Sequence, residues 1–348
     1  MNAIETKNLT KIYANNFKAV NSLNLEIPKG SIFGMLGPNG AGKTTTIKML
    51  TCLIQPTSGT ATVGGYDVSK NPDEVRNLLG MVPQQVSLYK DLTVMENSQL
   101  CADYYGVAPD ERDSRIEDLM ELVDIRYAKD KRVGQLSGGQ KQKASLVASL
   151  VHRPDILFLD EPTIGLDPTT KRTLWDLIRE LNDNGHTIIL CSHDMHEVDM
   201  LCDYVGIINT GNLVAYDTPQ GLKDSLLESN RQDITEALTH ISDENEVSTS
   251  TKEDLENLSL KKMSVLLKNQ NDDIVEAIRQ SDDVKSIEIA RNGRINLRVD
   301  SFDDMAVQNV LNDIISSGGI ITSIYTEEPS LEDVFIKSTS EVSEDDRA

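Results

Sequence analysis

The eight residues GPNGAGKT, at positions 37–44, constrain the fold of this chain more than any other stretch. They fit the pattern G-x-x-x-x-G-K-[ST], follow the apolar run SIFGML, and precede residues with helical spacing at Ile47, Leu50 and Ile54. Glycines let backbone N–H groups turn inward around phosphate oxygens where a helix begins. The pattern therefore predicts a buried strand, a phosphate-binding loop and a helix, as in an α/β nucleotide-binding fold.

The side chains of this loop predict the rest of a triphosphate site. Lys43 is expected to reach the terminal phosphates, and the Thr44 hydroxyl is expected to sit on Mg²⁺. An ordinary glycine-rich turn is the alternative, and the strand before the loop and the helix after it disfavour that interpretation. The residues expected to bind ATP here are Gly37, Pro38, Asn39, Gly40, Ala41, Gly42, Lys43, Thr44 and Thr45.

A second buried strand, in DILFLDEP, ends in two adjacent acids. Asp160 follows four apolar residues, the place where a metal-bound triphosphate needs a carboxylate, so we expect it to hold the water shell of the metal. Glu161 is expected to polarise the attacking water as a general base, the alternative being a solvated acid at a strand end. His193 directly follows the strand HTIILCS, where a side chain can reach the γ-phosphate, although a lone histidine is more often structural.

Beyond these sites, strands and helices alternate up to about residue 220, which predicts a parallel sheet with helical crossovers. Residues 91–133 look helical throughout and predict an insertion between sheet elements. Residues 223–260 are acidic and rich in serine and threonine, and they predict a linker with one helix in DITEALTHI. The first domain is thus expected at 1–222.

Residues 261–340 follow the order β-α-β-β-α-β, which predicts a small α+β domain of the ferredoxin-like kind. Asn292 and Gly293 predict a tight hairpin between its second and third strands. A last helix in SLEDVFIKS is expected to close this domain, and residues 341–348 are expected to form a disordered tail.

Charge and composition restrict the partners of the chain. The net charge is −22, of which residues 1–220 carry −7 and residues 221–348 carry −15. Such an acidic chain is a poor general binder of nucleic acid or of an anionic lipid surface. The four cysteines form no CxxC pair, which favours a reducing compartment, and no run of about 18 apolar residues is present. We expect a cytoplasmic protein whose membrane role, if it has one, comes through a partner.

Several further motifs stand in a familiar order. LSGGQ at 136–140 lies between GPNGAGKT and ILFLDEPT, and GLDP and CSHD follow. Over residues 3–220 the chain resembles the nucleotide-binding subunit of an ABC transporter. The resemblance implies a P-loop NTPase ABC cassette, with a mixed sheet and a helical subdomain at about 85–140, that hydrolyses ATP with Mg²⁺. EEPSLEDVF at 327–335 resembles the C-terminal extension of drug- and antibiotic-exporting ATPase subunits.

The resemblance assigns roles to four more side chains. Asp167 in GLDP is implied to be the D-loop residue, and His193 the switch histidine that contacts the γ-phosphate. Gln84 is implied to be the glutamine that touches Mg²⁺ and faces the membrane partner, although the adjacent Gln85 leaves the register open. Tyr13 is implied to stack on adenine, and a simple core position is the alternative.

LSGGQ itself predicts a second anion site, because Ser137, Gly138 and Gly139 open a helix with free N–H groups. The resemblance implies that these residues, with Gln140, bind the γ-phosphate held by another subunit's loop. Two copies of the chain would then pack head to tail around two ATP molecules. A separate permease would be engaged through residues 85–105, and the protein would lie on the inner face of the cell membrane.

One different class of protein remains as an alternative, a soluble ABC-type ATPase that acts on nucleic acid or ribosomes. Such proteins usually carry two cassettes or a long coiled coil together with basic surfaces, and the sequence has none of these features. Cargo selection belongs to the permease, so no cargo can be predicted.

Overall fold

The computed structural model describes residues 1–229, 232, 260–290, 293–300, 305–326 and 329–345. The chain divides into two compact units, which we describe separately. The first unit comprises Met1–Leu222 and Leu331–Ala348, and the second comprises Lys223–Ser330. The helix expected in DITEALTHI and residue Asn292 of the expected hairpin lie outside the described residues. In the described part, none of the helices combines the length and apolar character that a bilayer crossing requires.

The first unit contains a six-stranded sheet in the order β10-β9-β3-β8-β7-β6. Its strands β3, β6, β7, β8 and β9 run parallel, and β10 pairs antiparallel with β9. The bounds are β3 Ile32–Leu36, β6 Leu79–Val82, β7 Ile156–Asp160, β8 Thr187–Cys191, β9 Tyr204–Asn209 and β10 Asn212–Asp217. Every residue of β3 and β8 is buried, as expected for central strands covered on both faces.

A second, antiparallel sheet in the order β2-β1-β4-β5 shares a core with the first. It comprises β1 Asn2–Ile12, β2 Lys18–Pro28, β4 Ser58–Val63 and β5 Tyr66–Asp67. Helix α1, Lys43–Leu50, contacts β2 and β4, and its buried residues join a cluster that includes Phe33 of β3 and Phe158 of β7. The expected P-loop architecture with a mixed arrangement of sheets is therefore confirmed.

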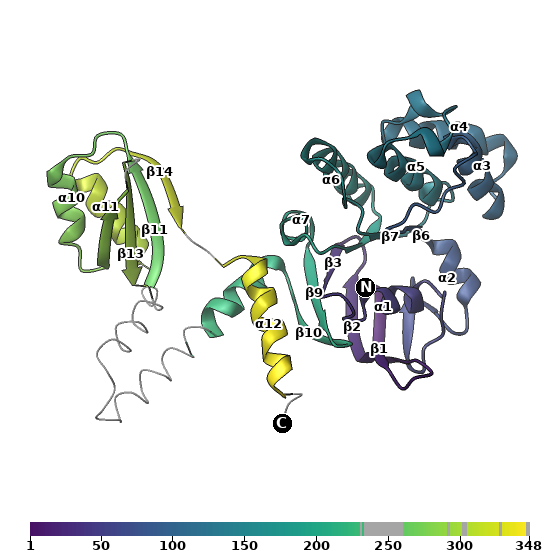
Figure 1. Cartoon of the computed structure of the whole chain (residues 1–348), viewed down its shortest axis with the longest axis horizontal. Coiled ribbons are helices and arrows are strands. Elements are labelled where there is room, and N and C mark those ends of the chain that lie inside the picture. The colour runs from purple at the N-terminus through teal and green to yellow at the C-terminus, as the bar shows by residue number, and fades with distance from the viewer. Residues whose placement is uncertain (230–231, 233–259, 291–292, 301–304, 327–328, 346–348) are drawn as a thin grey trace. The chain divides into compact units, whose positions relative to one another are not determined.

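Helices surround these sheets and form an arm, visible in Figure 1 around α3, α4 and α5. Contacts between α3 and α5, α3 and α4, and α4 and α5 hold this arm together, as expected for the helical region. Besides α1, the helices of the unit include α2 Pro72–Leu78, α3 Val94–Tyr104, α4 Pro109–Leu122, α5 Gly138–Leu150, α6 Pro168–Asp183 and α7 Met195–Leu201, with 3₁₀ turns at Arg126–Ala128 and Val133–Gln135.

The second unit is a four-stranded antiparallel sheet in the order β12-β13-β11-β14, with two helices. Its elements are β11 Leu260–Leu267, α10 Asp272–Arg279, β12 Val284–Ile289, β13 Arg294–Asp300, α11 Ala306–Ser316 and β14 Ile321–Thr326. Ile274 and Ile278 of α10 and Val310 and Ile314 of α11 pack on the alternate apolar residues of the strands. The expected βαββαβ domain is thus present.

The last helix, α12 Leu331–Asp345, differs from our expectation that it would close this small domain. It contacts α7, β9 and β10 of the first unit and lies beside β10 in Figure 1. Leu331 and Val334 are buried, and Asn209 Nδ2 donates a hydrogen bond to the carbonyl oxygen of Thr339 at 3.2 Å. Residues 341–345, expected to be a disordered tail, are the end of this helix, whereas 346–348 lie outside the described residues.

Candidate functional site

The phosphate loop occupies the turn between β3 and α1, as the sequence predicts. Gly40 and Gly42 have positive φ angles of 84° and 108°, and a Cβ atom on Gly42 would lie 2.3 Å from the carbonyl oxygen of Ala19. Only glycine fits this turn without displacing the neighbouring backbone. No side chain caps α1 and no acid lies in its first turn, so the amides at its start are available to bind an anion such as phosphate.

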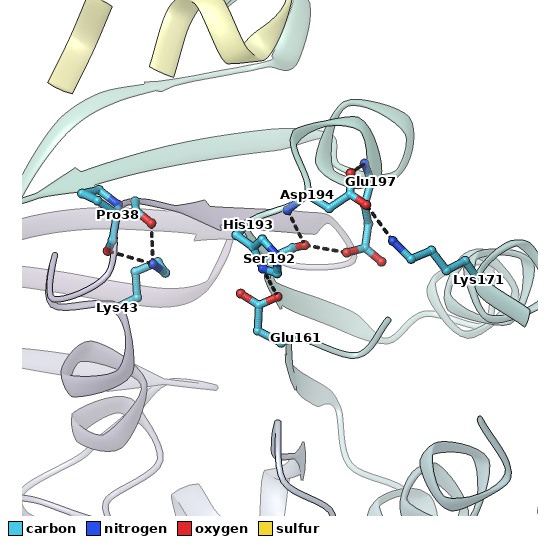
Figure 2. A network of polar contacts seen from close by, with 9 residues as sticks. Pro38, Lys43, Glu161, Lys171, Ser192, His193, Asp194 and Glu197 are labelled. Atoms are coloured by element: carbon cyan, nitrogen blue, oxygen red, sulfur yellow. Dashed lines mark hydrogen bonds and ion pairs between the residues drawn. The ribbon is translucent and has the colours of Figure 1, made fainter. Parts of the chain in front are cut away.

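Lys43 folds back along this loop, where its Nζ donates hydrogen bonds to the carbonyl oxygens of Gly37 and Pro38 (Figure 2). Burial lowers the pKa of Lys43, while Cys191, Glu161 and Asp160 act in the opposite direction. A half-buried cation whose hydrogen bonds go to carbonyl oxygens gains from an anionic partner. This position suits the terminal phosphates of ATP.

Asp160 and Glu161 stand at the end of β7, as expected. Burial raises the pKa of Asp160, and the nearby Glu161 raises it further. A cation bound beside these two neighbouring carboxylates would favour their charged forms and so oppose the rise in the pKa of Asp160. Among the described residues no group of three or more His, Cys, Asp or Glu side chains could hold a metal by itself. One carboxylate with hydroxyl and amide oxygens, completed by water and phosphate, is nevertheless the usual donor set for Mg²⁺.

Glu161 adopts an unusual backbone conformation with a φ of 52°. A residue other than glycine rarely occupies this region, and such strain at about 1–3 kcal/mol is most often found at functional sites. The Glu161 N–H donates to the carbonyl oxygen of Cys191 at 2.8 Å, which ties the turn to the end of β8. The side chain is 14% exposed, and its Oε2 lies 2.6 Å from Nδ1 of His193. The structure thus brings these two expected residues together.

Tyr13 and Gln84 border the same region from two sides. The hydroxyl of Tyr13 lies 3.5 Å from Oγ1 of Thr45 in the first turn of α1. The residue is 38% exposed, so Tyr13 does not occupy a core position. Strand β6 ends at Val82, paired with Leu159 one residue before Asp160, so Gln84 follows at the same edge of the sheet. Gln84 and Gln85 are both exposed, and the register between them stays open.

The LSGGQ turn forms the start of α5 through a capping box. The Ser137 side chain accepts from the Gln140 N–H, and Gln140 Oε1 accepts from the Ser137 N–H at 2.9 Å. Gln140 Nε2 also donates to the Tyr127 hydroxyl at 3.0 Å, a contact that the sequence gave no reason to expect. The signature turn is therefore held rigidly by its own side chains.

Asp167 caps α6 next to this turn. It accepts hydrogen bonds from the N–H groups of Thr169 and Thr170, and the Thr170 hydroxyl donates to it at 2.6 Å. These bonds lower the pKa of Asp167, and the Thr170 hydroxyl contributes most. A depression of about 380 Å³ lies between the two helix starts, lined by residues that include Ser137, Gly138, Gly139, Gln140, Gly165, Leu166 and Asp167.

The phosphate loop contributes nothing to the lining of this depression. The structure therefore brings Lys43, Thr44, Asp160, Glu161 and His193 to one edge of the six-stranded sheet, and it brings the signature and Asp167 to another place. Each place carries groups for an anion, and neither holds the complete set of expected residues.

Comparison with known proteins decides the family. Residues 20–164 match the family model described as ABC transporter, and residues 251–339 match the model for the C-terminal domain of DrrA1-3-like ATP-binding proteins. The linearmycin resistance ATP-binding protein LnrL of Bacillus subtilis (strain 168) is 35% identical over 252 residues, which cover 69% of this chain and 81% of the relative. The chain belongs to the ABC transporter ATP-binding proteins.

Other relatives agree with this assignment. The daunorubicin/doxorubicin resistance ATP-binding protein DrrA of Streptomyces peucetius is 41% identical over 224 residues, covering 64% of this chain and 68% of DrrA. A solved structure of the cassette MJ0796, described as a dimeric post-hydrolysis state bound to ADP and Pi, is 27% identical with a TM-score of 0.57, covering 62% of this chain and 98% of that one. This ABC protein is accordingly an ATPase subunit of the exporter type, and ABC cassettes of this kind work as dimers with a membrane permease. The alternative of a soluble ATPase acting on nucleic acid or ribosomes is not supported.

Proposed function

We propose that two copies of this chain pack head to tail and enclose two ATP molecules, each between the phosphate loop of one copy and the LSGGQ turn of the other. The observation that carries the proposal is the separation of the two half-sites, since the depression at Ser137 and Asp167 includes none of the phosphate-loop residues. A second copy would supply the missing half. This ATP-dependent closure would drive a separate permease at the inner face of the cell membrane.

In this arrangement each residue has a distinct task. Loop amides and Lys43 would hold the phosphates, Tyr13 would stack on adenine, and Ser137 with its two glycines would cover the γ-phosphate in the partner. Mg²⁺, held by Thr44, Gln84 and Asp160, would supply positive charge against the phosphates. Glu161 would take a proton from the attacking water, and His193 would both hold Glu161 and contact the γ-phosphate through its second ring nitrogen.

The geometry of the pair supports this division of labour. A carboxylate only accepts hydrogen bonds, so Nδ1 of His193 carries a proton and donates to Glu161. The other ring nitrogen, Nε2, is not used in this bond and can serve the contact with the γ-phosphate. His193 is 66% exposed, as a group that meets a ligand or a second chain should be. The Glu161 side chain is largely covered, which restricts the directions from which a water molecule can approach its carboxylate.

Export of a toxic organic compound is the transport activity that we propose, because the relatives named above carry resistance to linearmycin and to daunorubicin and doxorubicin. We further propose that the βαββαβ unit supports contact with the second copy or with the permease. Replacing residues 230–328 with a flexible linker, while α12 is kept, should weaken dimer formation or permease binding. Unchanged association on both counts would contradict this role.

Complementation between two inactive variants tests the head-to-tail arrangement. Ser137→Arg blocks the signature half-site and Lys43→Ala removes the phosphate-loop half-site, so each variant alone should be inactive. A mixture should form heterodimers with one intact site, and ATPase activity should return to about half that of the wild type per heterodimer. A mixture as inactive as its parents, although heterodimers are present in native mass spectrometry, would refute the arrangement.

A further inference from the structure

One face of α6 carries three residues at intervals of four. Asp167 is the N-cap of the helix, and Lys171 and Trp175 follow one and two turns later. Residues four apart on a helix lie above one another, so all three share one face. This face of α6 therefore links the D-loop, where the helix begins, to the residues that Lys171 and Trp175 contact.

Both residues contact the turn that carries His193. Nζ of Lys171 donates to Oδ2 of Asp194 at 2.9 Å, directly after the histidine. Nε1 of Trp175 donates to Oε1 of Glu197 at 2.9 Å, in the first turn of α7. The contact between Lys171 and Asp194 is drawn in Figure 2 together with the Glu161–His193 pair.

Glu197 is the centre of this network and is fully buried. Its Oε2 accepts a hydrogen bond from the Ser192 hydroxyl at 2.6 Å, and Ser192 Oγ in turn accepts from the Asp194 N–H at 3.1 Å. A buried carboxylate is costly unless both oxygens are bonded, and here Trp175 and Ser192 serve one oxygen each. The geometry of the network is therefore strongly constrained.

Ser192 and Asp194 are the two neighbours of His193 in the chain. The His193 side chain itself is exposed, and the hydrogen bond to Glu161 is the contact that holds its ring. Its backbone position is set by the flanking residues, which Glu197 and α6 hold. Movement of α6 would therefore be transmitted to His193.

We infer that Trp175 and Glu197 are positioning residues that couple the D-loop helix to the switch histidine. They touch neither ATP nor the attacking water; they hold His193 where it can support Glu161. The inference rests on the proposed function, because it assigns His193 and Asp167 the roles given there. It adds a path of contacts within one chain. The path begins at Asp167, where the second copy is expected to bind, and ends at Glu161 and His193 of the same chain.

A purely structural role for the network makes a different prediction. A residue that only stabilises the fold lowers activity by the same factor whether or not His193 is present. A residue that acts through His193 loses its effect once the histidine is removed, because effects within one coupled unit are not additive. A double-mutant cycle therefore separates the two roles.

The variants are chosen to disturb bonds more than packing. Trp175→Phe removes the indole N–H and keeps an aromatic ring. Glu197→Gln keeps the shape of the side chain, but its amide nitrogen only donates, so one of the two acceptor oxygens that serve Trp175 and Ser192 is lost. Glu180→Gln, on the exposed part of α6, is the matched control. Each is made in the full-length chain, with His193 and with His193→Ala, and the melting temperature of every variant is measured.

We expect Trp175→Phe and Glu197→Gln to lower kcat for ATP by about 10-fold, the scale of a lost hydrogen bond to a charged group, with KM changed less than about 2-fold. In the His193→Ala background, measured in single-turnover assays, either change should cost less than about 2-fold. Equal losses in both backgrounds, or no loss in either, would overturn the inference. If Glu197→Gln fails to fold, Trp175→Phe gives the result by itself.

Trp175 is the single tryptophan of the chain, so its emission gives a second measurement that does not depend on turnover. ATP and Mg²⁺ should change the emission of Glu161→Gln chains, because closure of the dimer at the D-loop should reach Trp175 through α6. Light scattering on the same samples reports whether ATP forms a dimer. A dimer without any emission change would refute the coupling and leave the proposed function standing, whereas the absence of a dimer would refute both.

Discussion

Nδ1 of His193 lies 2.6 Å from Oε2 of Glu161, although the two residues are 32 positions apart in the chain. The ends of the adjacent parallel strands β7 and β8 bring them together, with Asp160 paired to Cys191 just before them. The left-handed backbone of Glu161 turns its side chain out of the strand direction toward the histidine.

Replacement of Glu161 by glutamine is expected to stop hydrolysis and leave ATP binding intact. Loss of a general base costs about 10²–10⁴-fold in rate, while the isosteric amide keeps the local packing. The measurement is ATP turnover together with the fraction of dimer in ATP and Mg²⁺, which should rise. Glu180→Gln, an exposed change of the same kind, should leave both unchanged. Normal turnover of Glu161→Gln would remove Glu161 from the role of base.

Gly138→Ala should separate folding from ligand binding. A Cβ atom at Gly138 meets only Leu166 Cδ2, at 3.8 Å, so the isolated chain can accommodate it. Alanine also favours the helix by about 1 kcal/mol over glycine. We expect an equal or higher melting temperature and a loss of ATPase activity of about 10²-fold, because the added methyl group would keep the γ-phosphate away from the backbone N–H donors of the turn. Full activity would show that no phosphate approaches this turn.

Gly139→Ala provides the contrast. A Cβ atom there would lie 2.7 Å from Cγ2 of Thr170, so the signature turn and the start of α6 would have to move apart. We expect both the melting temperature and the ATPase activity to fall. The double variant Gly139→Ala with Thr170→Ser, which removes the methyl group but keeps the hydroxyl bonded to Asp167, should recover the melting temperature. Failure to recover would show that the clash is not the cause.

Asp160→Asn should make the protein more stable and inactive. Burial raises the pKa of Asp160, so the folded state holds its proton at pH values where the unfolded chain has lost it. The stability that the protonated form contributes is present below the unfolded pKa of about 4 and is lost as pH rises through the folded pKa. The melting temperature of Asp160→Asn should therefore exceed that of the wild type at pH 7 to 8. The difference should shrink toward pH 4, and a difference independent of pH would contradict this account.

The last helix is expected to stabilise the cassette. Leu331 of α12 is 1% exposed, and replacing a buried leucine by alanine costs about 2–5 kcal/mol. Leu331→Ala should lower the melting temperature of the first unit. The melting transition of that unit is identified as the one that saturating ATP shifts to a higher temperature. Ile336→Ala, at a position that is 58% exposed, is the control and should have little effect. Equal effects of the two changes would argue against packing of α12 on the cassette.

Local patterns predicted most of the elements, because phosphate loops, strand ends and helix caps are short-range features. Three motifs correctly predicted the elements on which they lie, namely GPNGAGKT, DILFLDEP and LSGGQ. The order β-α-β-β-α-β correctly predicted the second unit. Strand β10 was not predicted, since residues 212–217 have no clear alternation and their pairing with β9 depends on a hairpin at Gly211. The antiparallel pairing of β1 with β4 is likewise a contact between distant segments.

The site was predicted in its residue types but not in its connections. The sequence predicts roles for Glu161 and His193 independently of each other, and only the fold shows that the two side chains share a hydrogen bond. Trp175 and Glu197 were not chosen at all, because an amphipathic helix accounts for a tryptophan and an acidic residue in a first helical turn is ordinary. Helix α12 was assigned to its neighbour in sequence, because a sequence pattern does not show which surface an amphipathic helix covers.

The return of α12 to the first unit has a consequence for biosynthesis. Helix α12 completes the first unit but follows the βαββαβ unit in the chain, so it is synthesised after that unit. Until then α7, β9 and β10 lack the surface that α12 covers, so a truncated or stalled nascent chain would expose an unfinished apolar seam. The cassette can therefore finish folding only after the βαββαβ unit has also been synthesised.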